Sequence, residues 1–337
     1  MTRRALGAAL LAVGGVAGCT RPPATGAGGA LRTELSGKVM GTTFSIKTDG
    51  DPAPAMPAID ALHAVDARFS TYKPDSEISR FNAHRSTEPF ACSDEFAAVV
   101  ARALEVAEKT EGAFDPTIRP LMTLWGFETA ADGARTEPTQ EQIDAAVARV
   151  GWTKLHLDGT SLTKDVADLE LDLSAIAKGY GVDRAAQALI DAQVTGFMVD
   201  VGGEVRCRGT KPGGVPWRIG IEKPPAHPTE RAIEEVVEVH DHAIATSGSY
   251  RIWRRYGSRR VHHIFRPDTG RNAENPVVSV SLRATTCALA DALATSFMVR
   301  GPTGAEAVLD RFDDDNLGAL FLLHNGNGNV TQHPARW

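Results

Sequence analysis

Two short segments of the chain carry carboxylate, hydroxyl and ammonium groups at spacings that suit phosphate chemistry. The segment LDLSAIAKGYGVD at 171–183 places Asp172 at the end of an expected strand, and Ser174 and Lys178 in the first turns of an expected helix. The segment CALADALATSF at 287–297 places Asp291 and Thr295 at i and i+4, so both side chains share one helix face. Oxygen ligands of this kind, few in number, suit Mg²⁺, which retains waters and binds substrate phosphates. Solvated or capping residues also occur at this spacing, so the inference depends on the two segments together.

The elements that must position these segments are predicted by hydrophobic periodicity and capping signals. Helices are expected over 57–69, 94–111, 140–150, 174–193 and 286–300, where apolar residues recur at helical spacing. Thr139 with Gln142 predicts a capping box at the start of the third helix. Strands are expected over 38–48, 154–158, 197–208, 216–222, 233–247, 260–265 and 276–283, with a hairpin over 318–333. Because strands outnumber helices without regular β-α alternation, the sequence predicts an α+β fold with mixed, largely antiparallel sheets and packed helices.

The start of the chain has the features of a secretory signal. Paired Arg3 and Arg4 precede a small apolar run that is too short for a permanent membrane span. The run ends in Val-Ala-Gly followed by Cys19, which fits a bacterial lipobox and predicts cleavage before Cys19 and acylation of that residue. The alternative is a buried first strand with an incidental cysteine. We therefore expect three parts: a lipoprotein signal peptide at 1–18, a Pro/Gly/Ala-rich flexible tether at 19–32, and one domain at 33–337.

Composition narrows the classes of function. The 337 residues are 42% hydrophobic, which is enough for the core of one large domain or two closely joined lobes. The formal net charge of −6, without a basic stripe, argues against nucleic acid as a partner. Four cysteines occur without a CxxC pair, so neither a zinc site nor a disulfide framework is indicated.

Eight segments, in order along the chain, resemble the ApbE family of FAD:protein FMN transferases. They are KVMGTTFSIK (38–47), RFSTYKPDSEISRFN (68–82), TEGAFDPTIRPLMTLWGF (110–127), LDLSAIAKGYGVD (171–183), VDVGGEVRCRG (199–209), ATSGSYR (245–251), HHIFRPDTG (262–270) and CALADALATSF (287–297). The resemblance extends over residues 33–325, nearly the whole chain after the tether. It implies a two-lobed single domain with FAD in the cleft.

The resemblance also implies roles for individual residues. On sequence alone, Met40 is typical of a core methionine and Tyr72 of an interface tyrosine, although a thioether and a phenol can both contact a flat ring. Lys178 can act as a point charge near phosphate. The family places FAD contacts at Met40, Tyr72, Ala113, Phe114, Asp115, Asp172, Lys178 and Ile264, metal ligands at Asp291, Thr295 and the Ala175 carbonyl, and a catalytic base at His263.

The reaction implied by the resemblance is a Mg²⁺-dependent phosphoryl transfer. A threonine hydroxyl of a target redox protein takes the FMN moiety of FAD, and AMP leaves. The expected acceptors are flavin-carrying subunits of membrane quinone reductases or Rnf-type complexes. A lipoprotein on the periplasmic face of a membrane, the inner membrane being favoured, can reach such subunits. Two alternatives remain open: a Mg²⁺-dependent FAD pyrophosphatase that releases FMN and AMP, and a non-catalytic FAD-binding lipoprotein.

One position departs from the family pattern H-x-x-D-P-x-T-G. Here the string runs from His263 to Gly270 with Arg266 where the family has aspartate. An aspartate before proline commonly accepts backbone hydrogen bonds in a turn, and an arginine has only donors. Asp268 is expected either to restore a local acceptor or to pair with Arg266 at the surface.

Overall fold

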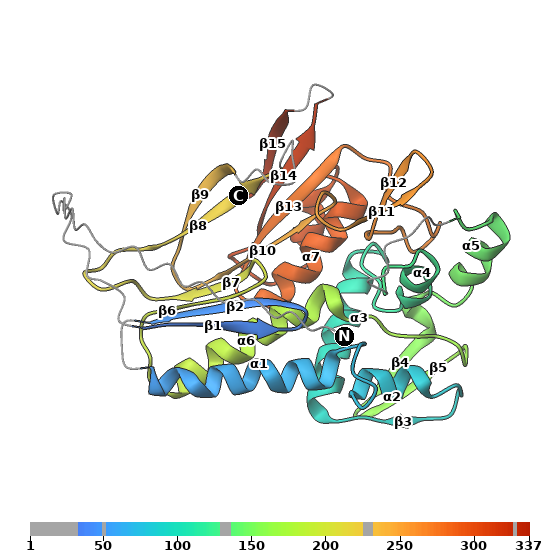
Figure 1. Cartoon of the computed structure of the whole chain (residues 1–337), viewed down its shortest axis with the longest axis horizontal. Helices are drawn as coiled ribbons and strands as arrows, with labels where there is room; N and C mark the ends of the chain where they lie inside the picture. Colours follow the sequence, from blue (N-terminus) through green and yellow to red (C-terminus); the bar gives the residue numbers. More distant parts are fainter. Residues whose placement is uncertain (1–32, 49–51, 129–135, 225–231, 326–328) are drawn as a thin grey trace, which may run out of the picture.

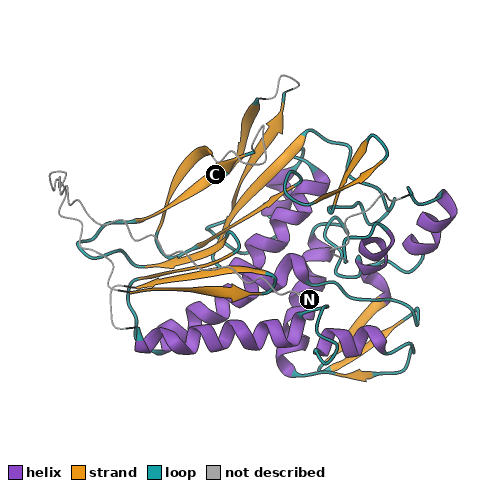
Figure 2. Ribbon diagram, in the orientation of Figure 1, coloured by secondary structure: helices purple, strands orange, loops and turns teal. Residues whose placement is uncertain are grey.

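An eight-stranded sheet forms the centre of the fold (Figures 1 and 2). The computed structural model describes residues 33–48, 52–128, 136–224, 232–325 and 329–337. Every strand pair in these residues is antiparallel. The strands of the central sheet, in spatial order, are β1 (Thr33–Val39), β2 (Thr42–Thr48), β6 (Phe197–Val201), β7 (Glu204–Arg208), β10 (Ala243–Gly248), β13 (Val277–Ala284), β14 (Gly318–His324) and β15 (Val330–Ala335).

Three long helices bury one face of this sheet. They are α1 (Met56–Phe69), α6 (Ser174–Asp191) and α7 (Cys287–Arg300). Helix α6 contacts β6 and β7, and α7 contacts β10 and β13, so the two helices meet above the middle of the sheet (Figure 1). Almost every position of α7 is buried, because the sheet, α6 and α3 (Asp94–Lys109) surround it.

Smaller elements complete the domain. Its helical pieces are α2 (Glu77–Ala83), α4 (Arg119–Leu124), α5 (Gln140–Val147), α8 (Ala305–Leu309) and the 3₁₀ turns Ala53–Ala55 and Trp152–Lys154. Its remaining strands are β3 (Phe90–Ala91), β5 (Ser161–Lys164) and β4 (Leu155–Asp158) in one sheet, β8 (Trp217–Lys223) with β9 (Ala232–Val239), and β11 (Trp253–Tyr256) with β12 (Arg259–His262).

The α+β class with largely antiparallel sheets is confirmed, as is the Thr139–Gln142 capping box. Three strand predictions are wrong, because 38–48, 197–208 and 233–247 each contain two strands. Met40 and Gly41 reverse the chain with φ of 50° and 72°, and Gly202 and Gly203 do so with φ of 66° and 104°. Two-residue turns of this kind leave the hydrophobic pattern on both sides almost unbroken.

Some predictions fall outside the described residues. They are the signal peptide at 1–18, the tether at 19–32 with Cys19, and the tip of the 318–333 hairpin at 326–328. None of the helices that the structure describes has the length and apolarity needed to cross a bilayer.

The crossing of α6 and α7 depends on a glycine. A Cβ atom at Gly179 would overlap the carbonyl oxygen of Cys287 and lie 2.8 Å from Cα of Ala288. Asp183, one turn further along α6, accepts hydrogen bonds from the backbone N–H groups of Cys287 and Ala288, both at 2.9 Å. These bonds satisfy two of the free donors at the start of α7 and fix its position against α6.

We predict that Gly179→Ala lowers the free energy of unfolding by about 1–3 kcal/mol, because the backbone of α7 must move to admit the methyl group. Gly181→Ala is the matched control, since the one close contact of its Cβ would be with the flexible Cε of Met40, at 2.5 Å, and the next atoms lie at 3.5 Å or more. Alanine also gains about 1 kcal/mol of helix propensity over glycine at both positions. Urea unfolding of the two variants tests this difference; equal stability of the two would contradict it.

Candidate functional site

A cavity of ≈ 300 Å³ opens beside the α6–α7 crossing. Its walls come from the first turns of α6, the middle of α7, the end of β10, and loops at 113–118 and 263–267. Residues from distant parts of the chain, proposed from the sequence as site residues, line this one cavity: Ala113, Phe114, Asp115, Asp172, Ala175, Lys178, His263, Ile264, Asp291 and Thr295.

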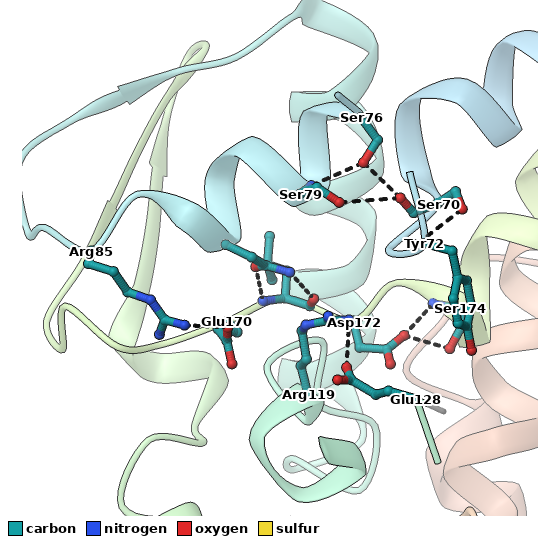
Figure 3. A network of polar contacts seen from close by, with 12 residues as sticks. Ser70, Tyr72, Ser76, Ser79, Arg85, Arg119, Glu128, Glu170, Asp172 and Ser174 are labelled. Carbon is teal, nitrogen blue, oxygen red and sulfur yellow. Dashed lines mark hydrogen bonds and ion pairs between the residues drawn. The ribbon is translucent and has the colours of Figure 1, made fainter. Parts of the chain in front are cut away.

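Two other predicted FAD contacts lie outside the cavity lining. Met40 occupies the turn between β1 and β2, and its side chain packs against α6 near Gly181. Tyr72 follows α1 and is 75% exposed, and its backbone N–H donates to Ser70 Oγ at 3.3 Å (Figure 3). The structure therefore brings most of the predicted residues together in one cavity lining, to which Met40 and Tyr72 do not belong.

A cluster of three charged side chains lies in the cavity wall. Lys178 Nζ is 3.0 Å from Glu204 Oε1 and 3.5 Å from Asp291 Oδ1. Asp291 Oδ2 accepts the backbone N–H of Gly179 at 3.1 Å. Burial opposes the charged form of Lys178, but the two carboxylates outweigh burial and raise the pKa of the ammonium group. Lys178 is therefore a permanent cation at this site.

Glu204 is a site residue that the sequence analysis did not identify. It directly follows Gly202 and Gly203 at the start of β7, and it is only 4% exposed. Burial is the main reason that its pKa rises to about 7, and Lys178 opposes that rise. Its Oε2 atom has no hydrogen-bond partner among the described residues. The available signal was an acidic residue directly after a glycine pair at the start of an apolar strand.

The carboxylates of Asp172 and Asp115 are already bonded within the protein. Asp172 Oδ1 accepts from the backbone N–H and the hydroxyl of Ser174, at 2.9 and 2.5 Å, and so bonds the first residue of α6 (Figure 3). Asp115 Oδ1 accepts from Thr117, and its Oδ2 accepts the backbone N–H of Trp152 at 3.0 Å. Burial raises the pKa of Asp115. Both aspartates shape the loops that line the cavity.

Hydroxyl groups on β10 contact α7 in the cavity wall and the neighbouring strand β13. Ser247 Oγ and Thr295 Oγ1 are 3.1 Å apart, and Thr246 Oγ1 lies 2.8 Å from Ser281 Oγ on the neighbouring strand. Thr295 therefore sits one helical turn after Asp291 with its hydroxyl held by β10. This arrangement places two oxygen ligands of the predicted set on the cavity side of α7.

His263 is oriented by a backbone carbonyl. Its Nδ1 lies 3.2 Å from the carbonyl oxygen of Ile252. A carbonyl only accepts, so Nδ1 carries the proton and Nε2 keeps the lone pair of the neutral ring. Burial is the main cause that lowers the pKa of His263, with the Lys178 cation adding to the effect. The imidazole is thus a neutral base at pH 7.

At the position that departs from the family pattern, Arg266 is exposed and pairs with a neighbouring side chain. Arg266 forms a two-point pair with Asp268, with Nε–Oδ1 and Nη2–Oδ2 distances of 3.0 and 2.6 Å. The turn itself is closed by backbone bonds, since the N–H of Gly270 donates to the Arg266 carbonyl at 2.9 Å. Of the two outcomes expected for Asp268, pairing with Arg266 is the one found.

Comparisons with known proteins confirm the resemblance. The model of the ApbE family matches residues 40–321. The FAD:protein FMN transferase of Vibrio cholerae is 43% identical over 319 residues, covering 93% of this chain and 92% of that protein. The FAD:protein FMN transferase of Escherichia coli K12 is 38% identical, covering 88% and 85% of the two chains. The solved flavin transferase ApbE from Vibrio cholerae superposes with a TM-score of 0.79 at 39% identity, covering 90% of this chain and 96% of that one.

Proposed function

This chain belongs to the ApbE family, and we propose that it transfers the FMN moiety of FAD to a threonine hydroxyl of an acceptor protein with release of AMP. Relatives of 43% and 38% identity bear the name FAD:protein FMN transferase, which makes the chain a transferase that acts with FAD on proteins. The observation that supports transfer to a threonine hydroxyl is the shared cavity. Lys178, His263 and Asp291 come from three distant segments of the chain and line it together.

The donor set of the cavity fits Mg²⁺. Asp291 is 2% exposed, yet within the described part of the chain the polar contact of its Oδ1 is the 3.5 Å one with Lys178, which is long for a charge-assisted hydrogen bond. An α-helix directs the N–H of Gly179 toward the Ala175 carbonyl, and Asp291 competes for that donor. No cluster of three His, Cys, Asp or Glu ligands occurs in the described residues, which suits a cation that also binds waters and substrate phosphates.

The chain's own residues have separate tasks in the transfer. The acceptor hydroxyl forms a new bond to the phosphorus on the FMN side, while the bond from that phosphorus to the bridging oxygen breaks and AMP leaves with that oxygen. His263 takes the proton of the hydroxyl at Nε2 and becomes an imidazolium. Lys178 presents a fixed positive charge to the phosphates. Mg²⁺, when bound, supplies charge neutralisation at the pyrophosphate.

We further propose that the enzyme is anchored at the periplasmic face of a membrane by acyl groups on Cys19. There it would meet flavin-carrying subunits of membrane redox complexes, of the quinone reductase or Rnf type. The support for this part is the lipobox sequence before Cys19 and the small, flexible composition of 19–32.

Asp291→Ala is expected to abolish FMN transfer while leaving the protein folded, because the only charged side chain in the proposed ligand set is lost. The assay incubates enzyme, FAD, Mg²⁺ and a recombinant acceptor subunit, and follows the acceptor's mass gain beside free FMN and AMP. Asp191→Ala, at the exposed end of α6, is the control and should match wild type. Near-normal turnover of Asp291→Ala at ordinary Mg²⁺ concentration would remove Asp291 from the site, and free FMN without acceptor mass gain would support hydrolysis instead.

His263→Ala is expected to slow transfer roughly 10²- to 10⁴-fold, the usual effect of removing a general base. In the wild type the base must be neutral, so the rate should fall only as pH drops through a pKa below the ordinary value of about 6.5.

Arg266→Asp should change the rate by less than about tenfold, since a surface turn pair acts through stability. Single-turnover AMP release measures the rates of both variants and, across pH, the profile of the wild type. An inactive wild type that Arg266→Asp rescues would show that this chain has lost the activity.

Cys19→Ala is expected to release the protein from membranes, since lipid chains provide the proposed anchor. Cell fractionation of full-length wild type and variant, with mass spectrometry of the mature N-terminus, measures the change. Wild-type protein found wholly in the soluble fraction, without lipid mass at its N-terminus, would exclude the anchor.

A further inference from the structure

A second hollow lies on the face of the central sheet that the helices leave open. On β2, Phe44 and Ile46 belong to the core beneath α1 and α6, so the alternate residues Thr43 and Ser45 face the other way. A groove of ≈ 1230 Å³ runs over this open face, between the β1–β2 hairpin and the β8–β9 ribbon. In the part of the chain that the structure describes, β1 is an end strand of the sheet, with a partner on one side only.

The groove adjoins the cavity. Gly202, Thr246, Gly248 and Arg251 line both hollows. The Arg251 guanidinium at this junction is held by an ion pair with Glu222. Glu222 also accepts a hydrogen bond from the Tyr250 hydroxyl at 3.1 Å. The junction of the two hollows is therefore bordered by glycine backbone and by an arginine held in an ion pair.

The chemistry of the groove suits polypeptide better than phosphate. Its charged lining residues are two acids, Asp200 and Glu222, and two bases, Lys38 and Arg251, so it offers no net positive charge. Its other lining is mostly small and polar, with hydroxyls of Ser36, Thr43 and Ser45 among glycines. A Cβ atom at Gly203 would meet nothing within 4 Å. Side-chain hydroxyls can donate to and accept from the amide groups of an extended chain.

We propose that this groove binds an extended, polar segment of the acceptor protein and directs its threonine hydroxyl through the junction into the cavity. The inference rests on the proposed function, because only a transferase needs a route for a second, macromolecular substrate. An acceptor that approaches from the groove meets the cavity past Gly202 and Gly248, while FAD occupies the cavity beside Lys178. The two substrates then have separate entrances to one reaction centre.

Thr43→Trp tests the proposal, because Thr43 is exposed on β2 and a tryptophan there would fill the groove. We expect the acceptor KM to rise at least about tenfold, the loss of roughly 1.4 kcal/mol of binding, with the Kd for FAD unchanged in a flavin-fluorescence titration. Thr331→Trp, exposed on β15 at the far end of the sheet, is the matched control and should leave both constants at wild-type values. A photo-crosslinker at Ser36 should, in addition, label the acceptor next to its modified threonine.

Three results would overturn the proposal, and each has a different meaning. An unchanged acceptor KM in Thr43→Trp, with no crosslink from Ser36, would exclude the groove while the transfer activity stands. Weakened FAD binding by Thr43→Trp would assign the groove to the dinucleotide. Wild-type enzyme that binds FAD but modifies no acceptor would overturn the proposed function and the groove with it.

Discussion

The close crossing of α6 and α7 is the constraint on which the site depends. The helix axes approach until only a glycine fits at position 179, and the backbone N–H of that residue also donates to Asp291 on the opposite helix. The same approach brings Lys178 within 3.5 Å of Asp291, and the packing of α6 on β7 brings it within 3.0 Å of Glu204. A wider crossing would separate the Lys178 cation from Asp291 and leave that buried carboxylate without its charged partner, which is costly. Stability and ligand binding therefore depend on the same contact.

The charge balance of this cluster is consistent with the cation that we propose for the site. One lysine faces two carboxylates, of which Glu204 responds to burial with a raised pKa while its Oε2 has no partner among the described residues. Fully ionised, the three groups carry an excess negative charge beside a cavity proposed to bind a pyrophosphate. The proposed divalent cation would remove that conflict, since it would compensate the protein's acids and the substrate's phosphates together. The neutral state of His263 agrees with this charge balance, because a protonated ring would compete with the cation for the carboxylates and the phosphates.

The sequence predicted local features well and long-range pairings poorly. The helix segments carrying Lys178 and Asp291 were correct, because periodicity and capping signals act over a few residues. The turns at Met40-Gly41 and Gly202-Gly203 were missed, since a two-residue reversal barely interrupts the apolar alternation. Glu204 was missed because its importance arises from Lys178, a partner on another element. Nor could any pattern reveal that Asp115 bonds the backbone of Trp152, for that contact exists only in the folded chain.

The order of the site segments along the chain has a consequence for how the enzyme is made. Gly179 and Asp291 are separated by 112 positions, and the central strand β10 is flanked by β7 and β13, which lie before and after it in sequence. Loop closure over such distances is slow and comes late in folding. A chain that ends before α7 lacks Asp291 and Thr295, and with them one wall of the cavity. The cavity is therefore complete only after the later part of the chain has been synthesised and has packed against α6.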